Sequence, residues 1–123
     1  MKYILYLHAI IEVIGGVVFY AAPHYILDMG SDQSLLFMTK IYGIMAVILG
    51  VVSMELARSW EYIPLFKRIY LVLMGMHVLI GFSCFGFYQA GIISLGAVVT
   101  HLGFSVLMMA GYFKDLPLFD EEK

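Results

Sequence analysis

Apolar residues in this chain are gathered in four long runs, and short polar segments separate them. A helix rises about 1.5 Å per residue, so about 20 apolar residues span the roughly 30 Å hydrocarbon core of a bilayer. The four runs have about this length and predict four membrane-spanning helices. We expect the spans at about residues 3–22, 35–57, 68–88 and 92–113.

The segments between the runs carry turn-forming residues and residues typical of a membrane interface. Pro23 ends the first run and opens a polar loop over residues 23–34, and Trp60 lies in the second loop, about residues 58–67. Short connections make neighbouring helices antiparallel. We therefore expect one all-α domain, residues 1–123, built as an integral membrane four-helix bundle in up-down-up-down order. Residues 114–123 form a short tail, and we expect residues 116–123 of it to fray.

Composition supports a bilayer environment and excludes two classes of function. The chain is 63% hydrophobic and 13% charged, which is far too apolar for a small soluble domain. Its net charge is −2 without a basic cluster, so we expect no nucleic-acid partner. Cys84 is the only cysteine, which excludes an intrachain disulfide and a CxxC redox centre.

The positive charges near the span ends are unevenly distributed between the two predicted sides. Only Lys40 lies on one side, whereas the other side carries Lys2, Arg58, Lys67, Arg68 and Lys114. Loops rich in Lys and Arg remain in the cytoplasm. We therefore predict a multi-pass protein of the cell (cytoplasmic) membrane with both termini and the tail in the cytoplasm.

Four ionisable residues lie inside the predicted spans, where leucine would be expected. Glu12 is 10 residues from Lys2, His77 is nine from Arg68, and His101 is 13 from Lys114. At the helical rise, these three residues lie within roughly 6 Å of one another in depth. His8 lies one turn closer to the cytoplasm on the same helix face as Glu12, and Glu55 is closer still.

A carboxylate at the middle of a bilayer costs about 3 kcal/mol on insertion scales, so Glu12 must be protonated or paired with a histidine. Our hypothesis is a catalytic set of Glu12, His77 and His101, with Glu12 as general acid or base and the histidines orienting it or relaying protons. His8 and Glu55 would line the approach and support this set.

Three kinds of site fit these residues. The preferred one binds a lipophilic small molecule, with proton-transfer or redox chemistry as an extension. A metal site would use Glu12, His77 and His101, with His8 as a fourth ligand, and would suit zinc or ferrous iron. A haem site would use His77 and His101 as axial ligands.

A purely structural role is the competing interpretation of the same residues. Polar side chains that bond across membrane helices contribute around 0.6 kcal/mol per contact and fix the packing register. An assembly subunit without catalysis would instead use a stripe of small residues on the second span to form a homodimer. The stripe consists of Gly43, Ala46, Gly50, Ser53 and Ala57.

Several positions in the first two spans resemble the DoxX-like group of small four-helix bacterial membrane proteins. They are a central glycine pair (Gly15 and Gly16) followed by Phe19 and Pro23, and then Ile41-Tyr42-Gly43, Gly50 and Ala57-Arg58. The resemblance covers roughly half of the chain. It implies a four-helix membrane fold, and some members of the group are associated with quinone or thiosulfate oxidation. It supplies no catalytic motif for numbered residues of this chain.

Overall fold

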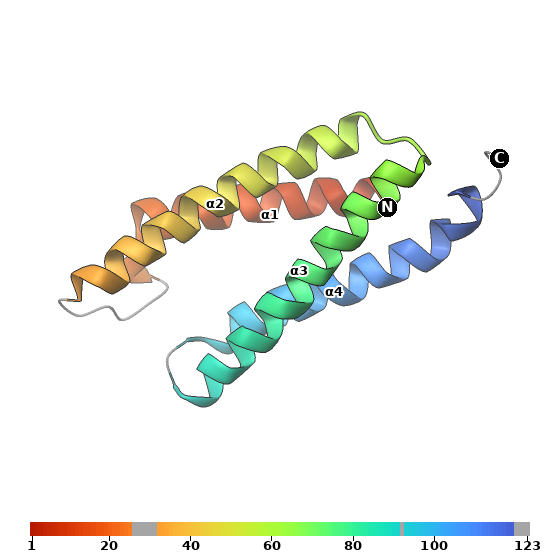
Figure 1. Ribbon diagram of the computed structural model, residues 1–123. Helices are drawn as coiled ribbons and strands as arrows, with labels where there is room; N and C mark the ends of the chain where they lie inside the picture. The colour runs from red at the N-terminus through yellow and green to blue at the C-terminus, as the bar shows by residue number, and fades with distance from the viewer. Residues whose placement is uncertain (26–31, 92, 120–123) are drawn as a thin grey trace. The chain divides into compact units, whose positions relative to one another are not determined.

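The computed structural model describes residues 1–25, 32–91 and 93–119, and this part of the chain is all-α (Figure 1). It contains four α-helices and two short 3-10 helices, and none of its residues forms a strand. The elements are α1 (Lys2–Ala21), η1 (Pro23–Tyr25), α2 (Gln33–Arg58), α3 (Pro64–Gln89), α4 (Leu95–Asp115) and η2 (Leu116–Phe119). Residues 26–31 of the predicted first loop lie outside the described residues.

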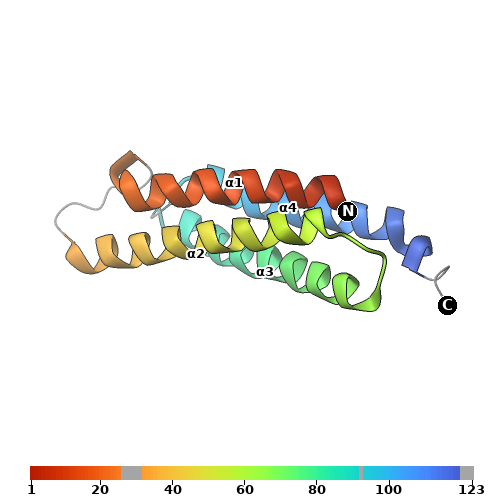
Figure 2. The same ribbon diagram turned by 90° about the horizontal axis from the view of Figure 1, so that it is seen from above.

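Two compact units make up the chain. The first, here called the N-terminal hairpin, is Leu5–Arg58 and contains most of α1 together with α2. The second, here called the C-terminal hairpin, is Ser59–Lys123 with Met1–Ile4, and contains α3 and α4. Within each unit the two long helices run side by side in opposite directions (Figures 1 and 2).

Glycines allow the two helices of the N-terminal hairpin to approach closely. A Cβ atom on Gly16 would lie 2.6 Å from the carbonyl oxygen of Gly43, and one on Gly50 would lie 2.9 Å from the carbonyl oxygen of Ala9. Beyond this contact, the rings of Phe19 and Tyr42 meet edge to face at 5.1 Å. The backbones therefore pack directly against each other, as small residues permit in membrane helices.

This packing changes the interpretation of the stripe of small residues on α2. We predicted the stripe as a surface for a second copy of the chain, but all five of its residues are buried. Gly43 and Gly50 contact α1 of the same chain. Gly43 and Gly50 therefore serve packing within the hairpin, and the homodimer through the stripe stays a prediction. Its members are Gly43, Ala46, Gly50, Ser53 and Ala57.

The C-terminal hairpin is closed by a glycine turn and held by contacts along its length. Gly91 has a φ of +73°, a left-handed conformation that glycine adopts without strain. Halfway along α3, the space beside Gly81 is filled by the side chain of Leu102 on α4. Nearer the other end, the buried Tyr70 hydroxyl donates to the carbonyl oxygen of Met108 over 3.1 Å.

An aromatic cluster closes the open end of the C-terminal hairpin. Trp60 stacks on Phe66 at 5.7 Å and meets Tyr70 edge to face at 5.9 Å. Phe119, in η2, packs against Trp60 and Tyr62 at 6.2 and 5.3 Å and is only 7% exposed. Residues 116–119 are thus folded where we expected the tail to fray, because a buried aromatic ring fixes them. Residues 120–123 lie outside the described residues.

The ends of the third and fourth helices differ from the predicted spans. The third helix begins at Pro64 rather than near residue 68, since proline lacks an N–H and fits the first turn of a helix. The fourth helix begins at Leu95 rather than residue 92, after an extended Ser94. The extended backbone of Ser94 interrupts the helical conformation at this point, and its side chain makes no capping hydrogen bond.

Among the described residues, four helical segments are long and apolar enough to cross a membrane. They are Lys2–Ala21, Gln33–Arg58, Pro64–Gln89 and Leu95–Phe119. Large apolar side chains on them point outward, and Val72 and Leu79 on α3 are 66% and 71% exposed. Such surfaces are unfavourable in water and favourable in lipid. The composition and helix lengths are those of a multi-pass membrane protein.

Candidate functional site

A buried histidine links the two helices of the N-terminal hairpin. His8 is fully buried, and its Nδ1 atom lies 2.8 Å from the hydroxyl oxygen of Ser53 on α2. Its Nε2 atom lies 3.5 Å from a carboxylate oxygen of Glu12, one turn further along α1. Glu12 is 9% exposed. The imidazole therefore lies between a hydroxyl group and an acid.

Close packing of the helix backbones explains how these side chains meet. Residues four apart share a helix face, which places Glu12 beside His8. The residue after His8 is Ala9, and its carbonyl oxygen would lie only 2.9 Å from a Cβ on Gly50 of α2. Ser53 is one turn beyond Gly50 on the same helix. The short serine side chain can reach His8 because no larger residue separates the helices at Gly50.

The arrangement of Ser53, His8 and Glu12 permits proton exchange along three groups. A serine hydroxyl both donates and accepts, and each imidazole nitrogen donates or accepts according to its tautomer. When Ser53 donates to Nδ1, the N–H of His8 is on Nε2 and faces Glu12. When His8 is an imidazolium, it donates to Ser53, and its positive charge compensates the charge of the Glu12 carboxylate. Either state lowers the cost of burying the acid.

A second pair of buried imidazoles lies in the C-terminal hairpin. The Nδ1 atoms of His77 on α3 and His101 on α4 are 3.0 Å apart, and the two rings stack at 5.2 Å between centroids. Phe104 packs on the His77 ring at 5.5 Å. His77 is 0% exposed and His101 is 8% exposed. The pair is thus buried, and an aromatic ring packs on one of its imidazoles.

Contact between two Nδ1 atoms restricts the protonation of the pair. One Nδ1 atom must carry a proton and the other must accept it, since two lone pairs or two N–H groups facing each other would repel. The contact therefore fits one shared proton. Proton transfer within the pair needs only a short movement between two nitrogens.

The geometry of this pair also tests the two predicted cofactors. A haem would have to lie between His77 and His101, but their Nδ1 atoms are in direct hydrogen-bond contact and the rings are stacked. The arrangement does not fit a bis-histidine haem. The two nitrogens are also candidate ligands of one divalent ion, which at about 2.0–2.1 Å from each would lie beside the line that joins them.

The predicted site residues divide between the two hairpins. The structure brings Glu12 to His8 and His77 to His101, whereas Glu55 is exposed and pairs with Arg58 at the end of α2. We predicted that His8 lines the approach to the site. In the structure it is fully buried and lies between Ser53 and Glu12. The grouping of Glu12 with His77 and His101 stays a prediction, because each hairpin is described by itself.

Sequence reasoning missed Ser53 as a polar partner. It placed this residue in the stripe of small residues and assigned the whole stripe to helix packing. The available signal was that Ser53 is the only residue of the stripe with a side-chain hydrogen-bonding group. A hydroxyl on a closely packed membrane helix face is expected to bond across to the neighbouring helix.

No protein-family model, curated protein or solved structure matches this chain. The resemblance to the DoxX-like group therefore stays a prediction. The fold and the composition define a class, namely small all-α chains with four helices able to cross a membrane. Within that class, the chain is distinguished by buried imidazoles in both of its hairpins.

Proposed function

We propose that this chain is an integral protein of the cell membrane that binds a lipophilic small molecule through its buried Glu and His side chains. In this proposal the four helices form an up-down-up-down bundle in the membrane, with both termini in the cytoplasm. The observation that carries the proposal is a buried, hydrogen-bonded imidazole in each hairpin, at His8 and at His77.

The energetic cost of these groups supports a function beyond packing. An ionisable side chain at the centre of a membrane helix costs about 3 kcal/mol, whereas a hydrogen bond between membrane helices returns around 0.6 kcal/mol on average. A leucine or alanine would pack at these positions without that cost. Ionisable groups retained in a span are therefore expected to serve a ligand or a proton.

The chemistry of the residues indicates the kind of ligand. Apolar surfaces of the helices would accept a hydrophobic body that enters from the bilayer, and imidazole and carboxyl groups would hydrogen-bond a polar head such as a carbonyl oxygen. Glu12 would donate or accept a proton at that head, and His8 would exchange it with Ser53. Short-chain benzoquinones combine an apolar body with carbonyl oxygens and are suitable probes.

The test is calorimetric titration of a short-chain benzoquinone into the purified protein in detergent. Glu12→Gln and His77→Asn should each weaken binding about five- to hundredfold, because a lost hydrogen bond to the head costs about 1–3 kcal/mol. Ser83→Ala is the control, since this exposed hydroxyl on α3 bonds to the Leu79 carbonyl of its own helix. Wild-type protein that binds no quinone, or two variants that bind it like the control, would contradict the proposal.

The second candidate function is binding of a divalent metal, favoured by the 3.0 Å separation of the His77 and His101 Nδ1 atoms. The predicted further ligands are Glu12 and His8. Elemental analysis of protein purified without added metal separates the two functions. One equivalent of zinc or iron that is lost in His77→Asn supports the metal site, and metal-free folded protein excludes it.

A further inference from the structure

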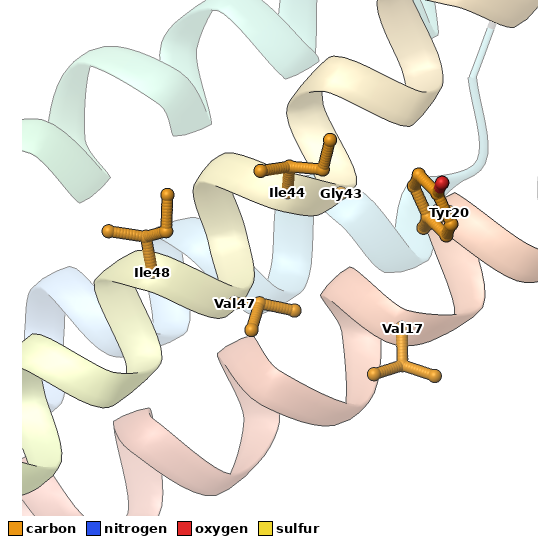
Figure 3. A pocket seen from close by; sticks show the side chains of 6 residues that line it. All are labelled: Val17, Tyr20, Gly43, Ile44, Val47 and Ile48. Carbon is orange, nitrogen blue, oxygen red and sulfur yellow. The ribbon is translucent and has the colours of Figure 1, made fainter.

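A shallow apolar groove lies on the N-terminal hairpin, further along α1 than His8 and Glu12. It has a volume of about 330 Å³ and lies between the second half of α1 and the middle of α2 (Figure 3). Six residues line it, namely Val17, Tyr20, Gly43, Ile44, Val47 and Ile48. Apart from the Tyr20 hydroxyl, these side chains carry no polar atom.

Close packing of the helices shapes this groove. Gly43 lets the two backbones meet beside the groove, since a Cβ there would lie 2.7 Å from the Gly16 carbonyl oxygen. Val17 and Ile48 stand at the sides and are about half exposed, at 52% and 51%. In a bilayer, a groove with such walls is filled by hydrocarbon.

One end of the groove carries a positive charge. Lys40 is one turn before Gly43 and Ile44 on α2, and its Nζ atom lies 5.6 Å from the centre of the Tyr20 ring, which lines the groove. Tyr20 is in the last turn of α1, where an aromatic residue marks the membrane interface. Lys40 can thus extend its ammonium group to the level of lipid headgroups.

Charge and shape together identify the occupant. We propose that this groove binds one anionic phospholipid of the surrounding membrane, with an acyl chain along Val17 and Ile48 and the phosphate on Lys40. Lys40 is the only basic residue of α2 before its final turn. The phosphate headgroup is therefore expected at the Lys40 end of the groove. None of the residues that line this groove belongs to the proposed Glu/His site, and lipid binding requires neither quinone nor metal.

A second copy of the chain is a weaker explanation for the groove. An α-helix is about 10–12 Å wide with its side chains, whereas an acyl chain is a single row of methylene groups. A shallow groove of about 330 Å³ suits the narrower occupant. A partner helix also offers no specific reason for a lysine at one end, whereas a phosphate does.

Native mass spectrometry can test the site with the full chain in detergent and an equal mixture of phosphatidylglycerol and phosphatidylcholine with identical acyl chains. The wild type should retain one phosphatidylglycerol in preference to phosphatidylcholine. Lys40→Gln should reduce that preference about fivefold, the equivalent of about 1 kcal/mol for one lysine at an anionic membrane surface. Ile48→Trp, which fills the groove from an exposed position, should reduce binding of both lipids.

Two control variants match these changes elsewhere on the molecule. Lys114→Gln removes an exposed lysine at the end of α4, and Leu79→Trp enlarges an exposed apolar residue on α3. Both should retain phosphatidylglycerol like the wild type, with unchanged helicity by circular dichroism. Equal retention of the two lipids by the wild type, or equal losses in Lys40→Gln and Lys114→Gln, would overturn the proposal. So would a preserved lipid adduct in Ile48→Trp, or a wild type that is dimeric and lipid-free.

Discussion

At the residue scale, the two buried histidine contacts differ in what they can exchange. His8 lies between a hydroxyl and a carboxylate, so its ring can pass a proton between unlike groups. His77 and His101 are like groups in direct Nδ1–Nδ1 contact, and one imidazole must donate to the other. The first contact suits donation to a ligand, and the second suits storage of a proton or binding of a cation.

A double-mutant cycle on the histidine pair tests whether the shared proton stabilises the fold. His77→Phe and His101→Phe retain an aromatic ring, but each leaves the other Nδ1 atom without this partner. Each single change should lower the free energy of unfolding by about 1–3 kcal/mol. The double variant should lose about 1 kcal/mol less than the sum, because it leaves no unmatched nitrogen in the pair. Thermal unfolding in detergent, followed by circular dichroism, measures all four proteins.

The double-mutant cycle isolates the coupling energy between the two histidines from the other interactions of their rings. Both histidines take part in further contacts, and the cycle subtracts the part that each single variant loses independently. Thr100→Ala serves as a control next to His101, because this exposed hydroxyl bonds to the Gly96 carbonyl of its own helix. Strictly additive losses in the two single variants would show that the Nδ1 contact contributes nothing to stability.

At the element scale, the two neighbouring glycines of α1 differ in whether they contact α2, which the sequence alone does not indicate. Gly15 and Gly16 are neighbours, yet a Cβ on Gly15 meets nothing within 4 Å, whereas one on Gly16 would collide with Gly43 and Val47 on α2. Only Gly16 is needed for the close approach of the two helices. That approach also brings the Ser53 side of α2 to His8.

Alanine substitutions at these two positions should therefore act in opposite directions. Gly15→Ala should raise the free energy of unfolding by about 0.5 kcal/mol, because alanine loses less backbone entropy in a helix. Gly16→Ala should lower it by about 1–3 kcal/mol, because a methyl group has to be forced between two backbones. Unfolding of the purified variants in detergent compares them directly. A Gly16→Ala variant as stable as Gly15→Ala would exclude the close backbone contact.

Helix number and type could be predicted from the sequence because long apolar runs have one main solution in a bilayer. Helix ends were less accessible, since Pro64 and Ser94 act through local backbone geometry that hydropathy does not register. In the site, the spacing of His8 and Glu12 fixed their contact through the helical repeat. The contact of His8 with Ser53 depends on how α1 and α2 are aligned along each other. The periodicity of one apolar run does not specify that alignment.

At the scale of the whole molecule, the distribution of basic residues is the main argument for orientation. In the proposed topology Lys40 is the only lysine or arginine near a span end on the outer side, and Lys2, Arg58, Lys67, Arg68 and Lys114 are in the cytoplasm. Basic residues near the ends of spans resist translocation. The proposed lipid site on Lys40 would then face the outer leaflet, opposite to the side on which most positive charge is concentrated.

Labelling of single cysteines tests this topology on the full chain, in a background where Cys84→Ser removes the native thiol. Asp32→Cys and Gln89→Cys lie at exposed positions that the topology places outside, and Glu61→Cys lies at an exposed position that it places inside. A membrane-impermeant maleimide should label the first two variants on intact cells, and label Glu61→Cys only after lysis. The reverse pattern would show that the basic residues do not set the orientation. Labelling of all three on intact cells would mean that α3 does not cross the membrane.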